Sequence, residues 1–505
     1  MNQIKSGLGT SLVGWNMTSW LASAANSFDD HDVELVYCGT EVTTERCLSF
    51  IKETIPAWQS RTVNFDEGEL FVLSGQQRPV IIMRPKPPTE AQKRDGGLLS
   101  PSAYGQARDL VGRAVSEARK LKAQKINVRF ESCQDREILG ALVGMEMAAY
   151  SYKQAMAPQP APLPALGLSV KGEWKDEAQA IAMGTNIARH LVNSPPNLLY
   201  PDSFANALHE LFSNVPGMTV DIWDEARLQK ENMGLLLGVG QGSDHKPRLV
   251  HLRYRPEGKR EAPLALVGKG ITFDCGGLDI KDPAGMRLMK KDMGGAAAAI
   301  GALYWMTRSA FARPLDVYIP LAENAISGKS YRPGDILRAR NGMTVEIHNT
   351  DAEGRLILAD AMAVAAAQTG ADKPAAIMVV ATLTGAIKIG LGSDVAGFFS
   401  NDEALGQVIS KRSQEWGDLM WRMPLFDGYR PRLETNVADI NHCATGSYGG
   451  AITAALFLAE FAKGYPFSHM DIYAWTDGER GALREGGGSG QAVQCLAGVL
   501  QSFGL

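Results

Sequence analysis

The sequence predicts an α/β protein with two α/β domains, the C-terminal one a mostly parallel, mixed sheet flanked by helices. The chain has 505 residues, which is long for one hydrophobic core. From Gly238 onwards β-like and helical segments alternate, which is the pattern of a mostly parallel sheet. Residues 157–164 are rich in proline and can form neither a helix nor a central strand. We therefore expect domains at residues 1–165 and 166–505.

The N-terminal part combines short apolar runs with an amphipathic helix. The runs at residues 33–37, 79–83 and 126–130 are typical of buried strands. Residues 107–122 carry apolar side chains at helical spacing, on Leu110, Val111, Ala114, Val115 and Ala118. No combination of residues with catalytic chemistry stands in this half.

The C-terminal part begins with a helix and continues with buried strands. Apolar residues recur at helical spacing from Asp176 until Pro195 and Pro196 end the helix. The apolar runs that predict strands are residues 264–267, 315–319, 376–380 and 470–473, and residues 451–463 form an Ala-rich helical segment. The glycine-rich segment at residues 486–490 lacks the residues of a phosphate loop, so we expect a flexible loop at the active site or an interface.

Composition excludes several classes of protein. A net charge of −4 argues against general attraction to nucleic acid or an anionic membrane, and only a local basic patch would change this. No apolar run approaches the roughly 18 residues that a membrane span needs. The six cysteines are scattered, as in a reduced cytoplasmic protein. The eight histidines show no zinc-type spacing, so a metal site must be built from carboxylates.

The segment at residues 349–356 lies between a β-like run and a helical one and carries two acids. Asp351 and Glu353 are two positions apart, so in an extended backbone their side chains leave the same side. Two carboxylates that face one point repel each other unless a cation lies between them. Arg355 could share that side and hold an anion in its planar fork. The alternative is helix capping by a polar turn, for which these residue types are also suited.

Two further acids stand upstream, at the end of a predicted strand and at the start of a predicted helix. Asp274 follows the buried run at residues 264–267 through a segment that we expect to break away from the strand, and Asp292 precedes an Ala-rich helix. Strand ends and helix starts of this kind place the sites of α/β sheets. Together with the first pair they make four carboxylates, enough to offset two divalent cations. Lys269 would then be a neutral amine ligand, whereas Lys281 would stay charged as an electrophile.

These motifs resemble those of the leucyl aminopeptidases, also called cytosol aminopeptidases, a family that includes the bacterial aminopeptidases A and B. Four blocks match in order, at residues 267–274, 289–295, 349–356 and 381–385. The resemblance implies an enzyme that releases N-terminal residues, such as Leu or Met, from peptides with two divalent ions, Mn²⁺ or Zn²⁺. It implies one ion on Lys269, Asp274, Asp292 and Glu353, and the other on Asp274, Asp351 and Glu353.

The resemblance also implies roles around the metal site. Lys281 would stabilise the oxyanion, and Arg355 would hold a bicarbonate that serves as the general base. The substrate-binding residues implied are Met289, Thr382, Leu383 and Gly385, whose alternative is a place in the core. Family members form hexamers, and their N-terminal domains serve assembly or regulation. Another two-metal hydrolase, such as a phosphatase, and a second role in DNA binding stay open as alternatives.

Two positions depart from the family pattern. Cys275 stands where serine is usual, and we expect a small buried side chain without a role, the alternative being sensitivity to oxidants. Asp279 stands where a small polar residue is usual, and it could restrict the freedom of Lys281 or raise the pKa of that lysine. A simple pair with Asp279 is the alternative to the catalytic role of Lys281.

Overall fold

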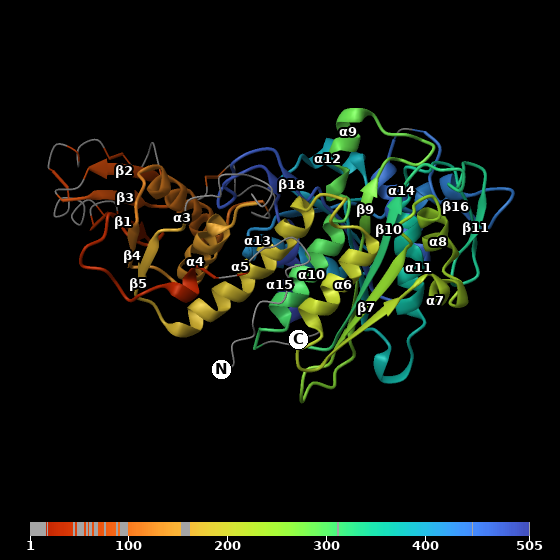
Figure 1. The fold of residues 1–505 in the computed structure, drawn as a ribbon, viewed down its shortest axis with the longest axis horizontal. Helices are drawn as coiled ribbons and strands as arrows, with labels where there is room; N and C mark the ends of the chain where they lie inside the picture. The colour runs from red at the N-terminus through yellow and green to blue at the C-terminus, as the bar shows by residue number, and fades with distance from the viewer. Residues whose placement is uncertain are drawn as a thin grey trace.

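The computed structural model contains two separate main sheets, which Figure 1 shows at the left and the right of the molecule. It describes residues 17–503 except for 18, 44–45, 48–54, 57–58, 60–62, 65–68, 75–76, 87–88, 91–98, 153–161, 311–312 and 447. Most of the proline-rich segment at residues 157–164 lies outside the described residues. The predicted α/β class is confirmed.

The N-terminal sheet has five strands in the order β2-β3-β1-β4-β5. Its strands are β1 (Val33–Cys38), β2 (Leu70–Ser74), β3 (Pro79–Met83), β4 (Lys125–Glu131) and β5 (Ala165–Leu168). All neighbours are parallel except β2 and β3. Helices α3 (Ala103–Lys120) and α4 (Asp135–Ala149) pack against each other beside it, and a short helix, η2 (Leu21–Ser23), precedes β1. The first sheet thus extends to Leu168, and the division into domains at residue 165 stays a prediction.

The large sheet has nine strands in the order β15-β14-β17-β13-β8-β10-β7-β6, with β9 paired to β10. The strands are β6 (Met218–Trp223), β7 (Arg248–Tyr254), β8 (Leu264–Gly268), β9 (Gly270–Asp274), β10 (Leu315–Asn324), β13 (Ala376–Ala381), β14 (Ala396–Ser400), β15 (Met420–Arg422) and β17 (Phe467–Asp471). The central strands β17, β13, β8 and β10 are parallel to one another. By contrast, β7 runs antiparallel to β10 and β6, and β14 runs antiparallel to β17 but parallel to β15. The predicted mostly parallel, mixed sheet is therefore confirmed.

Helices cover both faces of this sheet because its central strands are apolar on both sides. In β8, Leu264 and Leu266 belong to the core on one face, whereas Ala265 and Val267 belong to the core on the other. The first face is covered by α5 (Gly172–Asn193), α6 (Pro201–Phe212), α10 (Gly294–Met306), α13 (Glu403–Glu415) and α15 (Val493–Ser502). The second is covered by α7 (Glu225–Lys230), α8 (Gly234–Gly240), α11 (Gly354–Ala366) and α14 (Gly450–Glu460).

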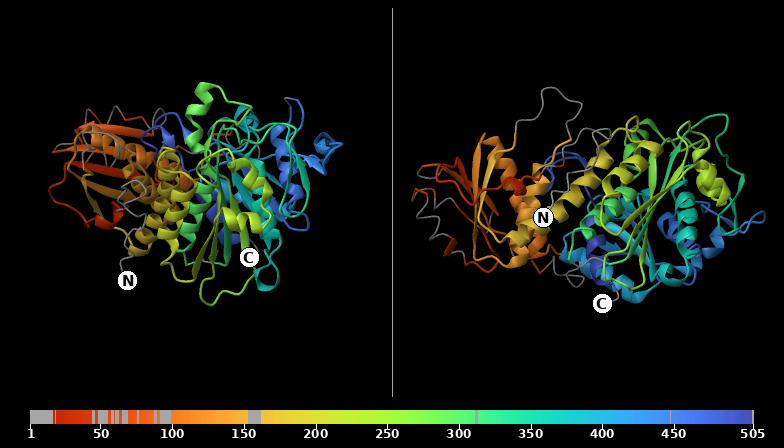
Figure 2. Two further views of the ribbon diagram at one scale, coloured as in Figure 1. Left: turned by 45° about the vertical axis from the view of Figure 1, so that its right-hand side comes forward. Right: turned by 60° about the horizontal axis from the view of Figure 1, so that its bottom comes forward.

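Helix α5 joins the two parts of the molecule. It contacts α4 beside the first sheet and α10 on the large sheet, and the views in Figure 2 show it between them. The remaining elements lie in the connections: α9 (Pro283–Arg287), η4 (Met289–Lys291), β11 (Ile336–Arg338), β12 (Thr344–Glu346), η5 (Gly370–Asp372), α12 (Gly385–Leu391), η6 (Asp427–Leu433), β16 (Ile440–Asn441), β18 (Trp475–Thr476) and β19 (Gly487–Gly488). No helix among the described residues is long and apolar enough to cross a membrane.

Two expectations for connecting segments differ from the structure. The segment up to Asp274 does not break from the sheet after β8, because Gly270–Asp274 forms β9 along the end of β10. The segment at residues 486–490 pairs with Trp475–Thr476 and packs on α5, where Gly488 N donates to Asn193 Oδ1 at 2.8 Å. Both segments are fixed by backbone pairing that apolar periodicity does not reveal.

Candidate metal centre

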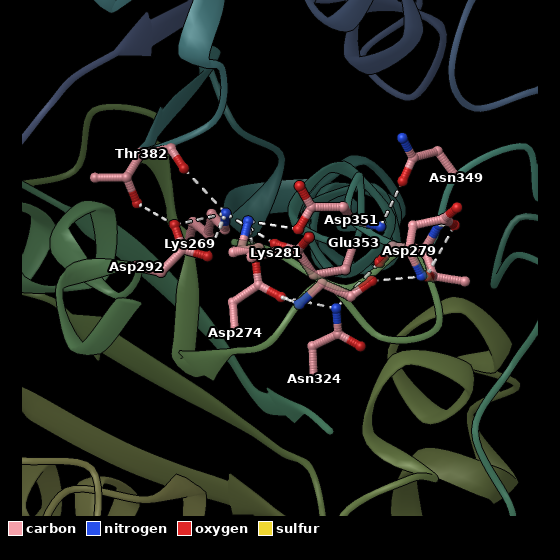
Figure 3. Close-up of polar contacts among 12 residues, drawn as sticks. Lys269, Asp274, Asp279, Lys281, Asp292, Asn324, Asn349, Asp351, Glu353 and Thr382 are labelled. Atoms are coloured by element: carbon pink, nitrogen blue, oxygen red, sulfur yellow. Dashed lines mark hydrogen bonds and ion pairs between the residues drawn. The ribbon is translucent and has the colours of Figure 1, made fainter. Parts of the chain in front are cut away.

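The charged residues singled out in the sequence meet beyond the carboxyl ends of the central strands, as Figure 3 shows. Lys269 is the single residue between β8 and β9, and Asp274 ends β9. Asp292 follows η4, and Glu353 is the N-cap of α11. Asp351 lies in the turn before that helix, so turn and helix start, rather than an extended strand, bring the two acids together.

The Lys269 ammonium links two of the acids and the end of β13. Its Nζ lies 2.8 Å from Asp292 Oδ2 and 2.9 Å from Glu353 Oε1, and it donates to Thr382 O at 2.9 Å. The Thr382 hydroxyl donates to Asp292 Oδ1, also at 2.9 Å. Lys269 is only 3% exposed, so its ammonium lies in the interior and not on the surface.

The Lys281 ammonium links the other two acids. Its Nζ lies 2.8 Å from Asp274 Oδ2 and 2.5 Å from Asp351 Oδ1. Asp274 Oδ1 accepts from Gly276 N and from Asn324 Nδ2, both at 2.8 Å. Each of the two ammonium groups thus contacts two carboxylates and offsets part of their negative charge. Neighbouring donors fix the orientation of Asp274.

The cluster has the composition and the free ligand atoms that divalent ions require. Oxygens of Asp274, Asp351 and Glu353 lie within 4.8 Å of one another. Glu353 Oε2 is buried and has no hydrogen-bond donor among the described residues. Asp292 Oδ2 and Asp351 Oδ1 likewise accept no hydrogen bond from the described part of the chain, although each lies near a lysine. Burying such oxygens is costly without a partner, and carboxylates are ligands for Mn²⁺ and Zn²⁺, so the residues fit two metal ions.

Burial and mutual repulsion shift the pKa values within the cluster. Burial, followed by the charges of Glu353 and Asp292, raises the pKa of Asp274 well above its usual value. Burial also raises the pKa of Asp292 and of Asp351. Burial alone would lower the pKa of Lys269, but Asp292 and Glu353 outweigh it and raise that pKa. Several shifted pKa values within one cluster are typical of functional sites.

Asp279 does not pair with Lys281. Asp279 Oδ2 accepts from Thr350 N at 2.7 Å and from Thr350 Oγ1 at 3.0 Å, and Lys281 contacts other carboxylates. Asp279 therefore ties the loop after β9 to the loop before α11 and does not control Lys281. Cys275 is buried, as expected for a small side chain that packs in the interior.

Arg355 is held by the backbone of the residue after β16, and its Nε has no acceptor among the described residues. It is 7% exposed, and its Nη1 donates to His442 O at 2.9 Å. Its Nε is buried without a hydrogen-bond acceptor among the residues described. His442 Nε2 lies 2.9 Å from Asn349 O, and its Nδ1 lies 3.1 Å from Glu346 O and 3.3 Å from His348 N. His442 thereby fixes the backbone that leads into Asp351.

Asp471 is a second supporting residue that the sequence motifs did not indicate. At the end of β17, it accepts from Leu383 N at 3.0 Å, Thr384 N at 3.2 Å and Thr384 Oγ1 at 2.6 Å. It holds the loop that carries Thr382, and burial raises its pKa to about 6. Of the other expected substrate-binding residues, Leu383 lies in the same loop, Gly385 is the first residue of α12, and Met289 is the first residue of η4. The sequence signal that could have identified Asp471 is its position at the end of a predicted strand, since sites of α/β sheets lie at strand ends.

Known proteins match this chain over most of its length. The family profile described as "Cytosol aminopeptidase family, catalytic domain" matches residues 186–497. A probable cytosol aminopeptidase of Rhodopirellula baltica is 39% identical over 364 residues, which is 72% of this chain and 70% of that protein. One from Methylorubrum extorquens is 44% identical over 297 residues, or 58% of each chain.

Solved structures extend the similarity to both parts of the fold. The bottromycin maturation enzyme BotP in complex with Mn has a TM-score of 0.80 and 29% identity, and the match covers 93% of this chain and 99% of that one. Cytosol aminopeptidase from Coxiella burnetii has a TM-score of 0.79 and 27% identity, covering 94% of this chain and 98% of its own. The resemblance drawn from the sequence motifs is thus confirmed, and this chain belongs to the cytosol aminopeptidase family.

Proposed function

We propose that this metal-dependent aminopeptidase works through the lysine–carboxylate cluster described above. Membership of the family shows a two-metal hydrolase that acts on the N-terminus of peptides. The observation that carries the assignment to this cluster is the buried Glu353 carboxylate: its Oε2 lacks a donor among the described residues, and one of its oxygens lies within 4.8 Å of ligand atoms on Asp274 and Asp351.

The ligands divide between two ions. Lys269, Asp274, Asp292 and Glu353 would hold one ion, and Asp274, Asp351 and Glu353 would hold the other. When bound, the ions supply Lewis acidity to the site. BotP was solved with Mn, which supports Mn²⁺ as an occupant here, with Zn²⁺ as the other candidate. In the metal-free protein the ammonium groups of Lys269 and Lys281 offset the carboxylate charges.

Lys281 and Arg355 would supply the positive charges that the reaction needs. Lys281 is held beside Asp274 and Asp351 and is 16% exposed, so its ammonium can face a bound peptide. There it would stabilise negative charge that develops on the carbonyl oxygen, an effect worth about 10²–10³ in rate for one donor. Arg355 has a buried Nε free for an anion, and a bicarbonate there would accept a proton.

Met289, Thr382, Leu383 and Gly385 would form the pocket for the N-terminal side chain. Their support is the packing of η4, the β13 loop and the start of α12 around Asp292 and Thr382. The protein would act in the cytoplasm as a homohexamer, as the family resemblance implies, and residues 1–165 would serve as a separate domain for assembly or regulation.

Two substitutions test the division of roles. Lys281→Ala should lower kcat by about 10²-fold or more while two metals still bind, because it removes a charge and no ligand. Asp351→Ala should lose metal as well as activity. Metal content by mass spectrometry and initial rates on an aminoacyl p-nitroanilide measure both effects. Near-normal kcat in Lys281→Ala, or full metal content in Asp351→Ala, would contradict the respective assignment.

A further inference from the structure

A cavity of about 580 Å³ lies between the two parts of the molecule. Arg113 on α3 lines one side of it, and Asp394 and Gln491, which follow α12 and β19, line another. Figure 1 shows α3 next to the blue segment around β18, and a Cβ added at Gly112 would lie 2.4 Å from Ala482 Cα. None of the metal ligands or pocket residues named above lines the cavity, so it is distinct from the metal centre.

The cavity is preformed because hydrogen bonds fix its walls to each other. The Arg108 side chain on α3 is only 12% exposed and donates to Trp416 O at 3.2 Å and to Gly417 O at 3.0 Å. The Ser102 hydroxyl, just before the same helix, donates to Glu415 O at 3.0 Å. Preformed cavities of this size at domain boundaries are common binding sites for small molecules.

Two charged side chains at the cavity retain groups without a partner. Arg113 is exposed and forms no ion pair or side-chain hydrogen bond within the described ranges. Asp109, by contrast, accepts from Arg108 with both oxygens, at 2.9 and 3.2 Å. Arg480 Nη1 lies 2.6 Å from Asp394 Oδ1, whereas Asp394 Oδ2 accepts no hydrogen bond from a residue that the structure describes. A ligand can therefore meet a guanidinium and a carboxylate oxygen here.

The lining also includes an apolar surface. The side chains of Leu110, Met147 and Leu483 are buried and line the cavity. Arg113 and Leu483 also line an adjoining cavity of about 250 Å³, which extends the space along α3. A matching ligand carries a carboxylate, an ammonium group and an apolar side chain. An inorganic anion would leave the apolar surface uncovered, and a simple carboxylic acid would give Asp394 no counter-charge.

We propose that this cavity is a second ligand site, which binds an amino-acid zwitterion with an apolar side chain, either a free amino acid such as leucine or a short peptide. The ligand carboxylate would accept hydrogen bonds from Arg113, and its ammonium group would donate to Asp394. Both sources are present wherever an aminopeptidase works, because the enzyme consumes peptides and releases amino acids. The site adds to the proposed function and does not depend on which residues hold the metals.

Gln491 connects the cavity to the proposed substrate pocket. Its Oε1 accepts from Tyr473 N at 2.9 Å and from Ala474 N at 3.1 Å. A Cβ added at Gly294 would meet Ala474 Cβ at 2.5 Å and Thr382 Cγ2 at 3.0 Å, so this segment packs against the loop after β13. A zwitterion in the cavity would therefore stabilise the segment behind the pocket, together with the contact between the two parts of the molecule.

Calorimetric titration of the metal-loaded enzyme with L-leucine, in saturating leucine hydroxamate, isolates the cavity. The hydroxamate chelates metal ions and has no carboxylate, so it occupies the metal centre and leaves the cavity free. We expect leucine still to bind and to raise the Tm. Leucinol, which lacks the carboxylate, and 4-methylpentanoate, which lacks the amine, should each bind about tenfold or more weakly.

A leucyl-leucine with a reduced peptide bond, which the enzyme cannot hydrolyse, distinguishes the two sources of the ligand. If it binds more tightly than leucine under the same conditions, the ligand is a short peptide. If it binds more weakly, the ligand is the free amino acid.

Two exposed side chains give the variants that test the contacts. Arg113→Met and Asp394→Asn should each weaken the hydroxamate-resistant binding of leucine by about tenfold or more, and should keep the wild-type kcat on leucine p-nitroanilide. A matched control is Arg119→Met, because Arg119 lies six residues further along α3 and lines neither cavity. This variant should bind leucine as the wild type does.

The failures of the two proposals are distinguishable. Leucine binding that the hydroxamate abolishes, or that both Arg113→Met and Asp394→Asn leave unchanged, would overturn this inference, and so would leucinol binding as tightly as leucine. Continued cleavage of leucine p-nitroanilide would then leave the proposed function intact. Hydroxamate-resistant binding that Arg113→Met weakens, in an enzyme that cleaves no aminoacyl substrate, would support the second site and overturn the proposed function.

Discussion

Gly354→Ala tests the role of Lys269 without changing any charged residue. Gly354 is the first residue of α11, where alanine by itself favours the helix by about 0.5–1 kcal/mol. The added Cβ, however, would lie 2.5 Å from Lys269 Cε and 2.7 Å from its Nζ. Ordinary contact begins near 3.4 Å, so the lysine must move by about 0.9 Å. A shift of that size breaks its contacts of 2.8–2.9 Å with Asp292, Glu353 and Thr382.

The expected loss follows from these contacts. Disrupting a buried ion pair costs about 3–5 kcal/mol, so after the helix gain the metal-free variant should lose roughly 2–4 kcal/mol of its free energy of unfolding. Urea unfolding measures this loss, and calorimetric titration with Mn²⁺ should show one of two metals bound much more weakly. Gly172→Ala is the control, since Gly172 is the first residue of α5 and its added Cβ meets nothing within 4 Å. Two metals at wild-type affinity in Gly354→Ala would refute the ligand role of Lys269.

Two further predictions concern buried groups around the site. Asp471→Ala removes three hydrogen bonds from Leu383 and Thr384 and should cost about 3–5 kcal/mol, whereas Asp471→Asn keeps an acceptor and should cost less. Thermal unfolding and KM compare them, and equal loss in both would contradict this. Burial and then the charge of Arg355 lower the pKa of His469 from 6.5 to about 3. Between pH 6.5 and about 3, His469 therefore binds a proton in the unfolded chain and not in the folded one, which lowers the free energy of unfolding as the pH falls. In His469→Leu this contribution is absent, so the free energy of unfolding should decline with falling pH less steeply than in the wild type. Identical slopes would contradict the assignment.

The sequence predicted that the acids of the cluster converge because they stand at strand ends and helix starts. Asp274 and Glu353 were expected to converge for this reason, and the structure brings their side chains together. The route differed in detail, since Gly270–Asp274 is a strand that extends the sheet along β10. Pairing across a sheet depends on partners far away in the chain, and a local pattern does not contain that information.

The supporting residues could not be predicted in the same way. His442, Asp471 and Asn324 each act through one to three hydrogen bonds to a distant segment, and a single polar residue has no periodic signal. Asp279 shows the converse error, because its nearness in sequence to Lys281 suggested a pair that the turn does not form.

The central claim is that two metals on the lysine–carboxylate cluster drive removal of N-terminal residues. The most direct measurement titrates chelator-stripped protein with Mn²⁺ or Zn²⁺ while following hydrolysis of leucine p-nitroanilide. The account predicts that activity returns with metal and saturates near two ions per chain. Protein that binds no metal, or that binds two ions and hydrolyses no aminoacyl substrate, would contradict it.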